Sequence, residues 1–374
     1  MREALLALLR DLVAIPSTTP PGDTTRIAAY CAQQLAALGY RTRTVEGAPG
    51  VANVVAALGS GGPSVVFNAH ADTVDAGERA AWRTDPFAAT VVEDRIHGLG
   101  AANCKASMAV HLWLARAIAQ AGGPTRGEVV FTFVGDEENL GPAGLAHLRE
   151  RGLVRPDLLV VAAPTRNRLV LEERGVMWLR ATTRGKAAHA GAPHTGDSAI
   201  LKMMRVIEAL SRLPARRSPS GQQATVSVGR IRGGENINVV PDLCTIEIDA
   251  RLLPEDDFDA VQRALREACE RAGAAQVELL TGTPGFRARE GGRGSAAFLE
   301  AIRAVTGREP EPLNVVGASD ARYFARDGIE MLVTGPGDGA DSHVPNEFVR
   351  VDELVQAAAI HREAAARLLG VRFR

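Results

Sequence analysis

Hydrophobic and polar residues follow two distinct patterns along the chain. Some segments repeat apolar residues at three- and four-residue steps, which is typical of amphipathic helices, whereas others are short uninterrupted apolar runs, typical of buried strands. The two kinds alternate, and this alternation predicts an α/β domain with a mostly parallel sheet and helices on both faces. We expect strands at 51–57, 64–69, 128–134, 158–163 and 329–334, and helices at 2–14, 24–38, 105–120, 141–151, 295–306 and 352–369.

The pattern changes between residues 175 and 283. This segment predicts an inserted α+β domain of the ferredoxin-like kind. Residues 1–174 and 284–374 would then form one discontinuous domain around it. Within the insert we expect strands at 176–183, 224–231 and 243–251, and helices at 198–213 and 256–272.

The composition narrows the classes of partner. The chain has 374 residues, 46% of them hydrophobic, which is enough for a large core and favours two domains over one. Its 43 Lys and Arg nearly balance 44 Asp and Glu, so we expect a small-molecule substrate and neither a nucleic-acid nor a membrane partner. The four cysteines form no CxxC pair and follow no secretory segment, which favours a reducing cytoplasm.

Candidate chemistry begins at the end of the predicted strand 64–69. In the run VVFNAHADTV, His70 follows the apolar residues and Asp72 comes two positions later. This spacing places both side chains on one side of an extended backbone, where Asp72 can orient the His70 ring. The alternative is a loop histidine beside a turn aspartate, and on this motif alone the alternative is the better interpretation.

A second cluster follows the predicted strand 128–134. The run VVFTFVGDEENLG ends in Asp136, Glu137 and Glu138, and carboxylates so close together repel unless a cation or a proton separates them. Paired glutamates indicate one metal ligand and one general base. The alternative is an acidic first turn that complements a helix dipole, which is common and contributes only about 0.3–1 kcal/mol.

Eight motifs in order carry a resemblance to a known family. They are HADTV, GLGAANCKAS, GDEE, AAPT, GKAAHAGAPHTG, NINVVPD, GASDAR and GPGDGADSHVPNE, and they span essentially the whole chain. The chain resembles the dinuclear zinc aminoacylase and carboxypeptidase family, which includes acetylornithine deacetylase, succinyl-diaminopimelate desuccinylase and glutamate carboxypeptidases. The motifs are specific for the fold of that family and not for a substrate.

The resemblance assigns a role to each residue of the two clusters. It implies that His70, Glu138 and His343 are metal ligands. It also implies that Glu137 is the base that activates water and that Asp72 orients His70. All five residues are present in this sequence.

The resemblance extends to the inserted domain, which it implies is a lid and a dimerisation domain. His189 would then be an oxyanion contact that reaches a neighbouring subunit's site, and Asn238 and Arg251 would grip a substrate carboxylate or carbonyl. By the same analogy the protein would be a homodimer. Without the resemblance, His189 is a turn residue and Arg251 a surface cation.

Two positions depart from the family pattern. Asn103 stands where the family has an aspartate that bridges both metals, and Ala163 stands where it has an acidic ligand. Zinc prefers His, Cys and carboxylate ligands, so Asn103 is a weak ligand at best and Ala163 is none. We therefore expect either one zinc per chain, held by Glu138 and His343 with the Asn103 carbonyl, or none.

Three functions remain open at this stage. The first is hydrolysis of an amide bond in an N-acyl amino acid or small peptide with an altered metal site. The second is a metal-independent reaction on the same scaffold, such as acyl transfer, cyclisation or isomerisation. The third is ligand binding without turnover. We rank amide hydrolysis first, since both glutamates and all three histidines of the set are present together.

Overall fold

The computed structural model describes residues 1–20, 22–289, 291–311, 313–315 and 317–373, and they divide into two compact units. Unit 1 comprises Met1–Leu171, Ala288–Leu313 and Ser319–Arg374, and unit 2 is mainly Glu172–Arg287. The predicted insert, 175–283, lies inside unit 2. Among the described residues, no helix is both long and apolar enough to cross a membrane.

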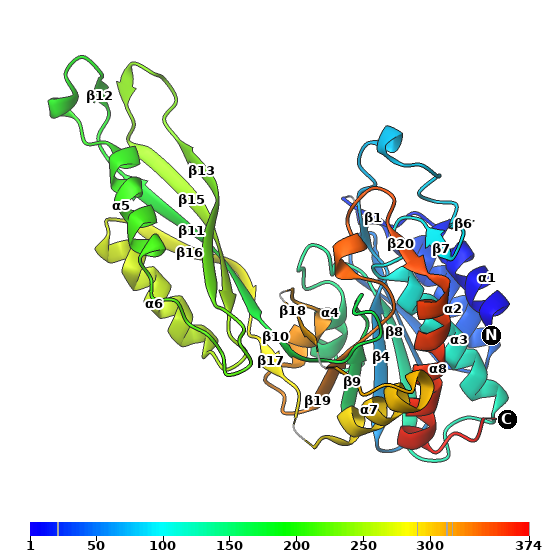
Figure 1. Cartoon of the computed structure of the whole chain (residues 1–374). Coiled ribbons are helices and arrows are strands. Elements are labelled where there is room, and N and C mark those ends of the chain that lie inside the picture. Colours follow the sequence, from blue (N-terminus) through cyan, green and yellow to red (C-terminus); the bar gives the residue numbers. More distant parts are fainter. Residues whose placement is uncertain (21, 290, 312, 316, 374) are drawn as a thin grey trace. The chain divides into compact units, whose positions relative to one another are not determined.

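Unit 1 contains most of a mixed sheet in the order β17-β10-β19-β9-β4-β8-β3-β2, with β18 beside β10. Its centre, from β19 to β8, is parallel, and the pairs on either side of this centre are antiparallel. Helices lie on both sides of the sheet, as the sequence pattern predicts (Figure 1). The strands are β2 (Arg41–Ala48), β3 (Val51–Gly59), β4 (Ser64–His70), β8 (Glu128–Val134), β9 (Leu158–Val161), β10 (Val170–Glu173), β17 (Phe286–Arg287), β18 (Leu313–Val315) and β19 (Glu330–Val333).

The helices of unit 1 supply many residues of its hydrophobic core. They are α1 (Arg2–Val13), α2 (Thr25–Ala37), α3 (Lys105–Gln120), α4 (Leu145–Glu150), α7 (Arg293–Thr306) and α8 (Val351–Leu369). Two small sheets complete the unit. In one, β1 (Thr18–Thr19) pairs with β5 (Thr73–Val74), and in the other β7 (Arg95–His97) lies between β6 (Thr90–Val92) and β20 (Phe348–Arg350). Single 3-10 turns occur at Arg79–Ala81, Asp320–Phe324 and Gly339–Asp341.

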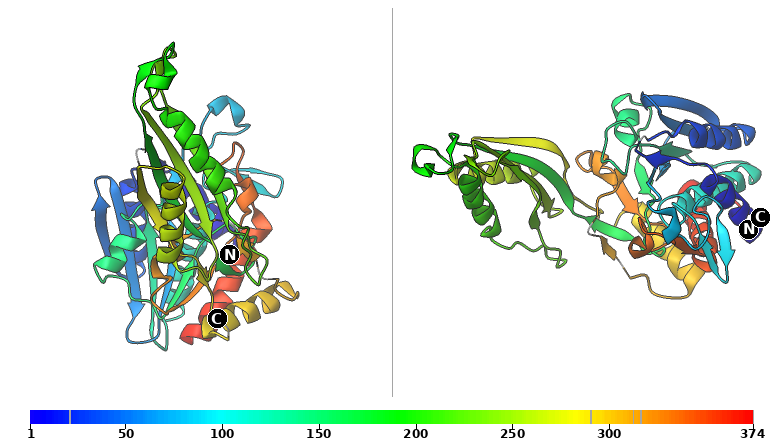
Figure 2. Two further views of the ribbon diagram at one scale, coloured as in Figure 1. Left: turned by 90° about the vertical axis from the view of Figure 1, so that its left-hand side faces the viewer. Right: turned by 90° about the horizontal axis from the view of Figure 1, so that it is seen from above.

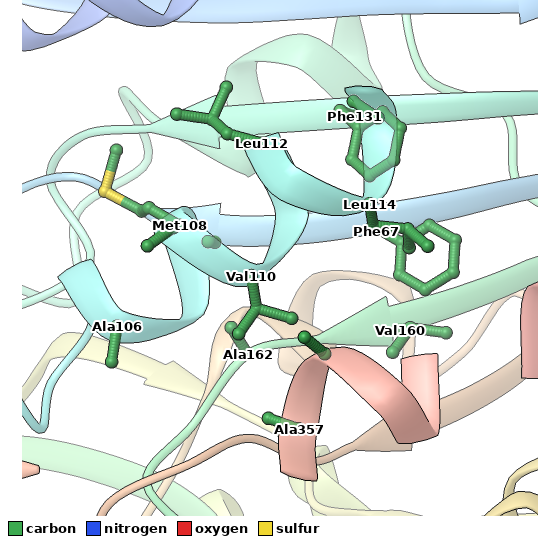
Figure 3. Packing of buried hydrophobic residues seen from close by; sticks show 14 of the residues in the cluster. Phe67, Ala106, Met108, Val110, Leu112, Leu114, Phe131, Val160, Ala162 and Ala357 are labelled. Atoms are coloured by element: carbon green, nitrogen blue, oxygen red, sulfur yellow. The ribbon is translucent and has the colours of Figure 1, made fainter. Parts of the chain in front are cut away.

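Apolar side chains fill the space between α3 and the central strands. Phe67 of β4 and Phe131 of β8 stack with ring centroids 5.5 Å apart (Figure 3). Two histidines are buried in the same core, His111 on α3 and His361 on α8, with ring centroids 5.6 Å apart. All seven residues of β4 are buried, since strands pair with it on both sides and helices cover both faces of the sheet. The strand therefore ends at His70 in a fixed place.

Unit 2 has two layers, a four-stranded antiparallel sheet and two helices. Figures 1 and 2 show α5 (Ala199–Ser211) and α6 (Phe258–Arg271) side by side on one face of this sheet. Side chains of Ser198 and Asp257 accept hydrogen bonds from the first turns of the two helices, which satisfies backbone N–H groups there. The sheet order is β13 (Thr225–Gly233), β15 (Leu243–Leu252), β11 (Gly175–Arg184) and β16 (Gln276–Thr283).

The chain order within unit 2 is strand, helix, strand, strand, helix, strand. With this sheet order it is the ferredoxin-like arrangement that the sequence pattern predicts. A short extension carries β12 (Ala188–His189) paired with β14 (Val239–Val240), and a 3-10 turn at Pro193–Thr195.

Candidate active site

His70 and Asp72 leave the end of β4 and are tied to each other. The His70 ring nitrogen Nδ1 lies 3.0 Å from the Asp72 carbonyl oxygen and 3.5 Å from its carboxylate Oδ1. That carboxylate accepts hydrogen bonds from the backbone N–H groups of Glu137 (3.3 Å) and Glu138 (3.0 Å). Burial opposes ionisation of Asp72, but His70 and these N–H groups outweigh it and lower the pKa of Asp72. Asp72 thus joins the loop after β4 to the loop after β8.

The two glutamates after β8 point to different partners. Glu137 Oε1 lies 3.1 Å from the Arg322 guanidinium, and its Oε2 lies 3.9 Å from His70 Nε2. Glu138 Oε1 lies 2.8 Å from His343 Nε2, and this hydrogen bond raises the pKa of His343. Burial raises the pKa of Glu137 above its usual range, although His70 and Arg322 act in the opposite direction. A raised pKa is what a general base needs to work near neutral pH.

Asn103 lies between these groups, in the turn before α3. Its carbonyl oxygen Oδ1 is 3.0 Å from His70 Nε2, and its nitrogen Nδ2 is 3.0 Å from Glu138 Oε1 and from His343 Nε2. The backbone is held by the buried Glu347, whose carboxylate accepts hydrogen bonds from the N–H groups of Ala102 (2.8 Å) and Asn103 (2.9 Å). Asn103 is thus a hydrogen-bonding partner of predicted metal ligands.

The acceptors around Asn103 fix where its hydrogens lie. A carboxylate only accepts, so the amide turns its NH2 toward Glu138 and its oxygen toward His70. The other nitrogen of His70 faces the Asp72 carbonyl oxygen, so an oxygen acceptor lies beside each ring nitrogen. Burial alone would lower the pKa of His70, but Cys104, Asp72 and Glu137 raise it well above its usual value.

The donor set does not fit a pair of divalent ions. Ala163 offers only a methyl group, and the neutral Asn103 amide cannot bridge two cations as a carboxylate does. Among the described residues, the group whose ligand atoms all lie within 4.8 Å of one another is His70, Glu137 and Glu138. His343 is not part of that group, although it contacts Glu138. The Asn103 carbonyl faces His70, away from the pair with which we expected it to bind zinc.

The three predicted residues of the insert lie in unit 2. His189 in β12 is exposed, and its Nδ1 accepts a hydrogen bond from the N–H of Gly191. Asn238 lies beside it, because its carbonyl oxygen accepts a hydrogen bond from the N–H of Ala190. Arg251 in β15 forms two hydrogen bonds to the Asp249 carboxylate, at 2.7 and 2.9 Å. Their roles toward a substrate therefore stay predictions.

Several buried polar residues of the site were not singled out from the sequence. Arg322 is 1% exposed on its side chain and lies 3.7 Å from Asp320 as well as 3.1 Å from Glu137. Asp320 in turn accepts a hydrogen bond from Asn68 at 2.9 Å. The sequence signal is an Asp and an Arg among small residues in GASDAR. The partner of Arg322 is Glu137, which lies 185 positions away in the chain. Only the fold shows that the two meet.

A buried glutamate at the end of parallel strands, beside two histidines and a second carboxylate, is the arrangement expected of an amidohydrolase- or peptidase-like α/β enzyme. Residues 66–367 match the model of Peptidase family M20/M25/M40, and the chain belongs to this family. This confirms the resemblance drawn from the motifs.

Relatives and solved structures agree with this assignment. The chain is 29% identical over 379 residues to a succinyl-diaminopimelate desuccinylase of Rhodospirillum centenum, covering 97% of this chain and 96% of the relative. It is 30% identical to the Bordetella petrii enzyme of the same name, covering 98% of each. An M20 family metallo-carboxypeptidase from Sulfolobus solfataricus has the same fold, with a TM-score of 0.81 and 17% identity over 98% of this chain and 99% of that one. A Bacillus subtilis M20 family protein described as a dinuclear metal binding peptidase has a TM-score of 0.71 and 19% identity, covering 99% of both chains.

Proposed function

We propose that this protein hydrolyses an amide bond in an N-acyl amino acid or small peptide that carries a carboxylate. The observation that carries the proposal is Glu137, a buried carboxyl group held by Arg322 3.1 Å away and lying within 3.9 Å of His70. A buried base with a raised pKa, fixed in orientation, is suited to removing a proton from an attacking water. The names of the curated relatives support an acylated amino acid as the substrate class.

The residues of unit 1 divide the reaction between them. Glu137 accepts the proton of the attacking water and later returns it to the leaving amine, while Arg322 keeps the carboxylate from turning away. When it is protonated, His70 offsets negative charge beside Glu137. Where a single zinc ion is bound, Glu138 and His343 would hold it, and it would polarise the carbonyl of the substrate. We propose at most one zinc per chain.

The residues of unit 2 would recognise the substrate. Asn238 and Arg251 are proposed to bind its carboxylate or carbonyl, and His189 to stabilise the oxyanion. Of these residues, Arg251 has the most fixed orientation, since its two hydrogen bonds to Asp249 set the plane of its guanidinium. A location in the cytoplasm stays part of the proposal, and it rests on four cysteines that are all free and buried.

A second candidate is a metal-independent reaction on the same scaffold, with Glu137 or His189 handling protons. Asn103 and Ala163 favour it, because both replace a possible metal ligand by a neutral group. The distinction between the two candidates is the effect of a chelator on turnover.

The test of the proposed function is a substrate panel. Protein purified without chelator is incubated with N-acetyl and N-succinyl amino acids and with dipeptides, and release of the free amine is followed. We expect turnover of at least one acylated amino acid, with no more than one zinc per chain by elemental analysis. Turnover that survives chelation identifies the metal-independent candidate. Ligand-induced stabilisation without release of amine would contradict amide hydrolysis, and a ligand recovered chemically unchanged would contradict both candidates.

We also propose that the protein is a homodimer through unit 2. The helix α5 exposes Leu201 and Met204, each 59% exposed, and the edge strand β13 exposes Ile231 at 55%. An unpaired strand edge beside apolar side chains is a surface that a second copy can cover.

The dimer has a direct test. The double variant Met204→Lys and Ile231→Lys is expected to elute as a monomer in size-exclusion chromatography where the unchanged protein elutes as a dimer. Leu280→Lys, on the opposite edge strand β16, is the matched control and should leave the dimer intact. A monomer before any substitution would contradict the proposal.

A further inference from the structure

The contacts of Asn103 form one continuous chain of hydrogen bonds. His70 Nε2 donates to Asn103 Oδ1 at 3.0 Å, and Asn103 Nδ2 donates to Glu138 Oε1 at 3.0 Å. His343 Nε2 lies 2.8 Å from the same Glu138 oxygen and donates to it. The 3.0 Å separation between Asn103 Nδ2 and His343 Nε2 closes this triangle without a bond of its own. Each donor in the chain meets an acceptor.

These hydrogen bonds use the atoms that would otherwise face a metal ion. A histidine nitrogen binds a metal through its lone pair, and a nitrogen that donates a hydrogen bond has no lone pair to offer. Both Nε2 atoms, of His70 and His343, donate in this arrangement. An amide nitrogen likewise carries its hydrogens into the middle of the cluster, where a cation would be repelled.

The backbone that carries the Asn103 amide is also held by hydrogen bonds. The buried carboxylate of Glu347, 1% exposed, holds the two backbone N–H groups at Ala102 and Asn103. Asp72 holds the backbone N–H of Glu138 in the same way. Asn103 and Glu138 are thus positioned by the buried carboxylates of Glu347 and Asp72. Neither contact needs a metal ion.

We propose that the Asn103 side chain is a structural cross-link that takes the place of a metal bridge, so that His70, Glu138 and His343 are assembled by hydrogen bonds in the metal-free protein. This inference concerns how the site is held together and does not depend on the proposed substrate. A site assembled in this way discriminates against zinc, because binding an ion would break two of the hydrogen bonds.

The first test compares melting temperatures with a chelator and with added zinc. The unchanged protein is expected to melt at the same temperature, within about 1 °C, in both conditions. Asn103→Ala removes both central bonds and is expected to lower the melting temperature by roughly 4 °C or more in the chelator. A drop of several degrees on chelation of the unchanged protein would overturn the proposal, as would an Asn103→Ala variant that melts like the unchanged protein.

The second test restores carboxylates. Asn103→Asp combined with Ala163→Glu is expected to raise the zinc content measured by elemental analysis from at most one toward two per chain and to make the melting temperature rise with zinc. Asn236→Asp, which makes the same Asn-to-Asp change at an exposed position in unit 2, is the control for that substitution and should do neither. Two zinc ions in the unchanged protein, or no gain in the double variant, would contradict the cross-link.

A third measurement is made on the protein with an unchanged site. In a sample with labelled asparagine, the Asn103 NH2 resonances, assigned by their loss in Asn103→Ala, should exchange slowly with solvent in the presence of chelator. Fast exchange in the unchanged protein would overturn the proposal. If no amide is cleaved but these three results hold, the proposed function fails and the cross-link stands. If an amide is cleaved but these three results fail, the proposed function stands and the cross-link is wrong.

Discussion

Replacing Glu137 by Gln is expected to lower kcat/KM for a cleaved acyl amino acid by about 10²–10⁴-fold, the usual contribution of a general base. The amide has almost the same shape but cannot accept a proton from water. The protein should still fold, because Arg322 keeps its contacts to Asp320 and to the Tyr323 hydroxyl.

The pH dependence of the same reaction provides a check on the assignment. The base works only when it is deprotonated, and burial raises the pKa of Glu137 above 4.5. The rate should therefore rise with pH through an apparent pKa above that value, and the rise should be absent from any residual activity of Glu137→Gln. Glu150→Gln, an exposed position on α4, is the matched control. Equal losses in both variants would remove Glu137 from the role of base.

Acid is expected to destabilise unit 1 through the two histidines in its core. Burial lowers the pKa of His361 from 6.5 to about 4 and lowers that of His111 as well. No hydrogen-bond partner for either ring nitrogen of His111, or for Nε2 of His361, lies among the described residues. Both rings are therefore neutral in the folded protein, surrounded by Phe67, Phe131 and other aromatic groups.

The sign of the effect follows from proton binding. Below pH 6.5 the unfolded chain binds protons at these histidines and the folded chain does not, so stability is complete above 6.5 and is lost as the pH falls. For His361 alone the loss reaches about 3 kcal/mol by pH 4, since each pKa unit corresponds to about 1.4 kcal/mol. Protonation of His111 adds to this loss.

The measurement is urea unfolding at pH 7.5, 5.5 and 4.5 for the unchanged protein and for His361→Phe, which keeps a ring at that position and cannot take up a proton. We expect the variant to lose less stability on acidification. Carboxylates such as Asp72 contribute to acid sensitivity in both proteins, so only the difference between the two is informative. Parallel curves would show that His361 does not sense pH.

Much of the fold is determined by local pattern. The helix at 105–120 and the strand at 128–134 have the predicted bounds, since each is a long segment with uniform burial. The edge strand β2 was not predicted, because its sequence RTRTVEGA is mostly polar and its side chains are exposed or half-buried. Its strand character comes from pairing with β3, a contact that no local pattern records.

The sequence by itself determined the order of the elements, the ferredoxin-like insert and the titratable residues at strand ends, because periodicity and residue type are local properties. Only the tertiary structure decided that Asn103 meets His70, Glu138 and His343, and that Arg322 is the partner of Glu137. These contacts join residues between 33 and 240 positions apart, and the orientation of an amide is set by the acceptors around it. A single neutral residue that reads as a lost metal ligand in the sequence is a hydrogen-bonding centre in the fold.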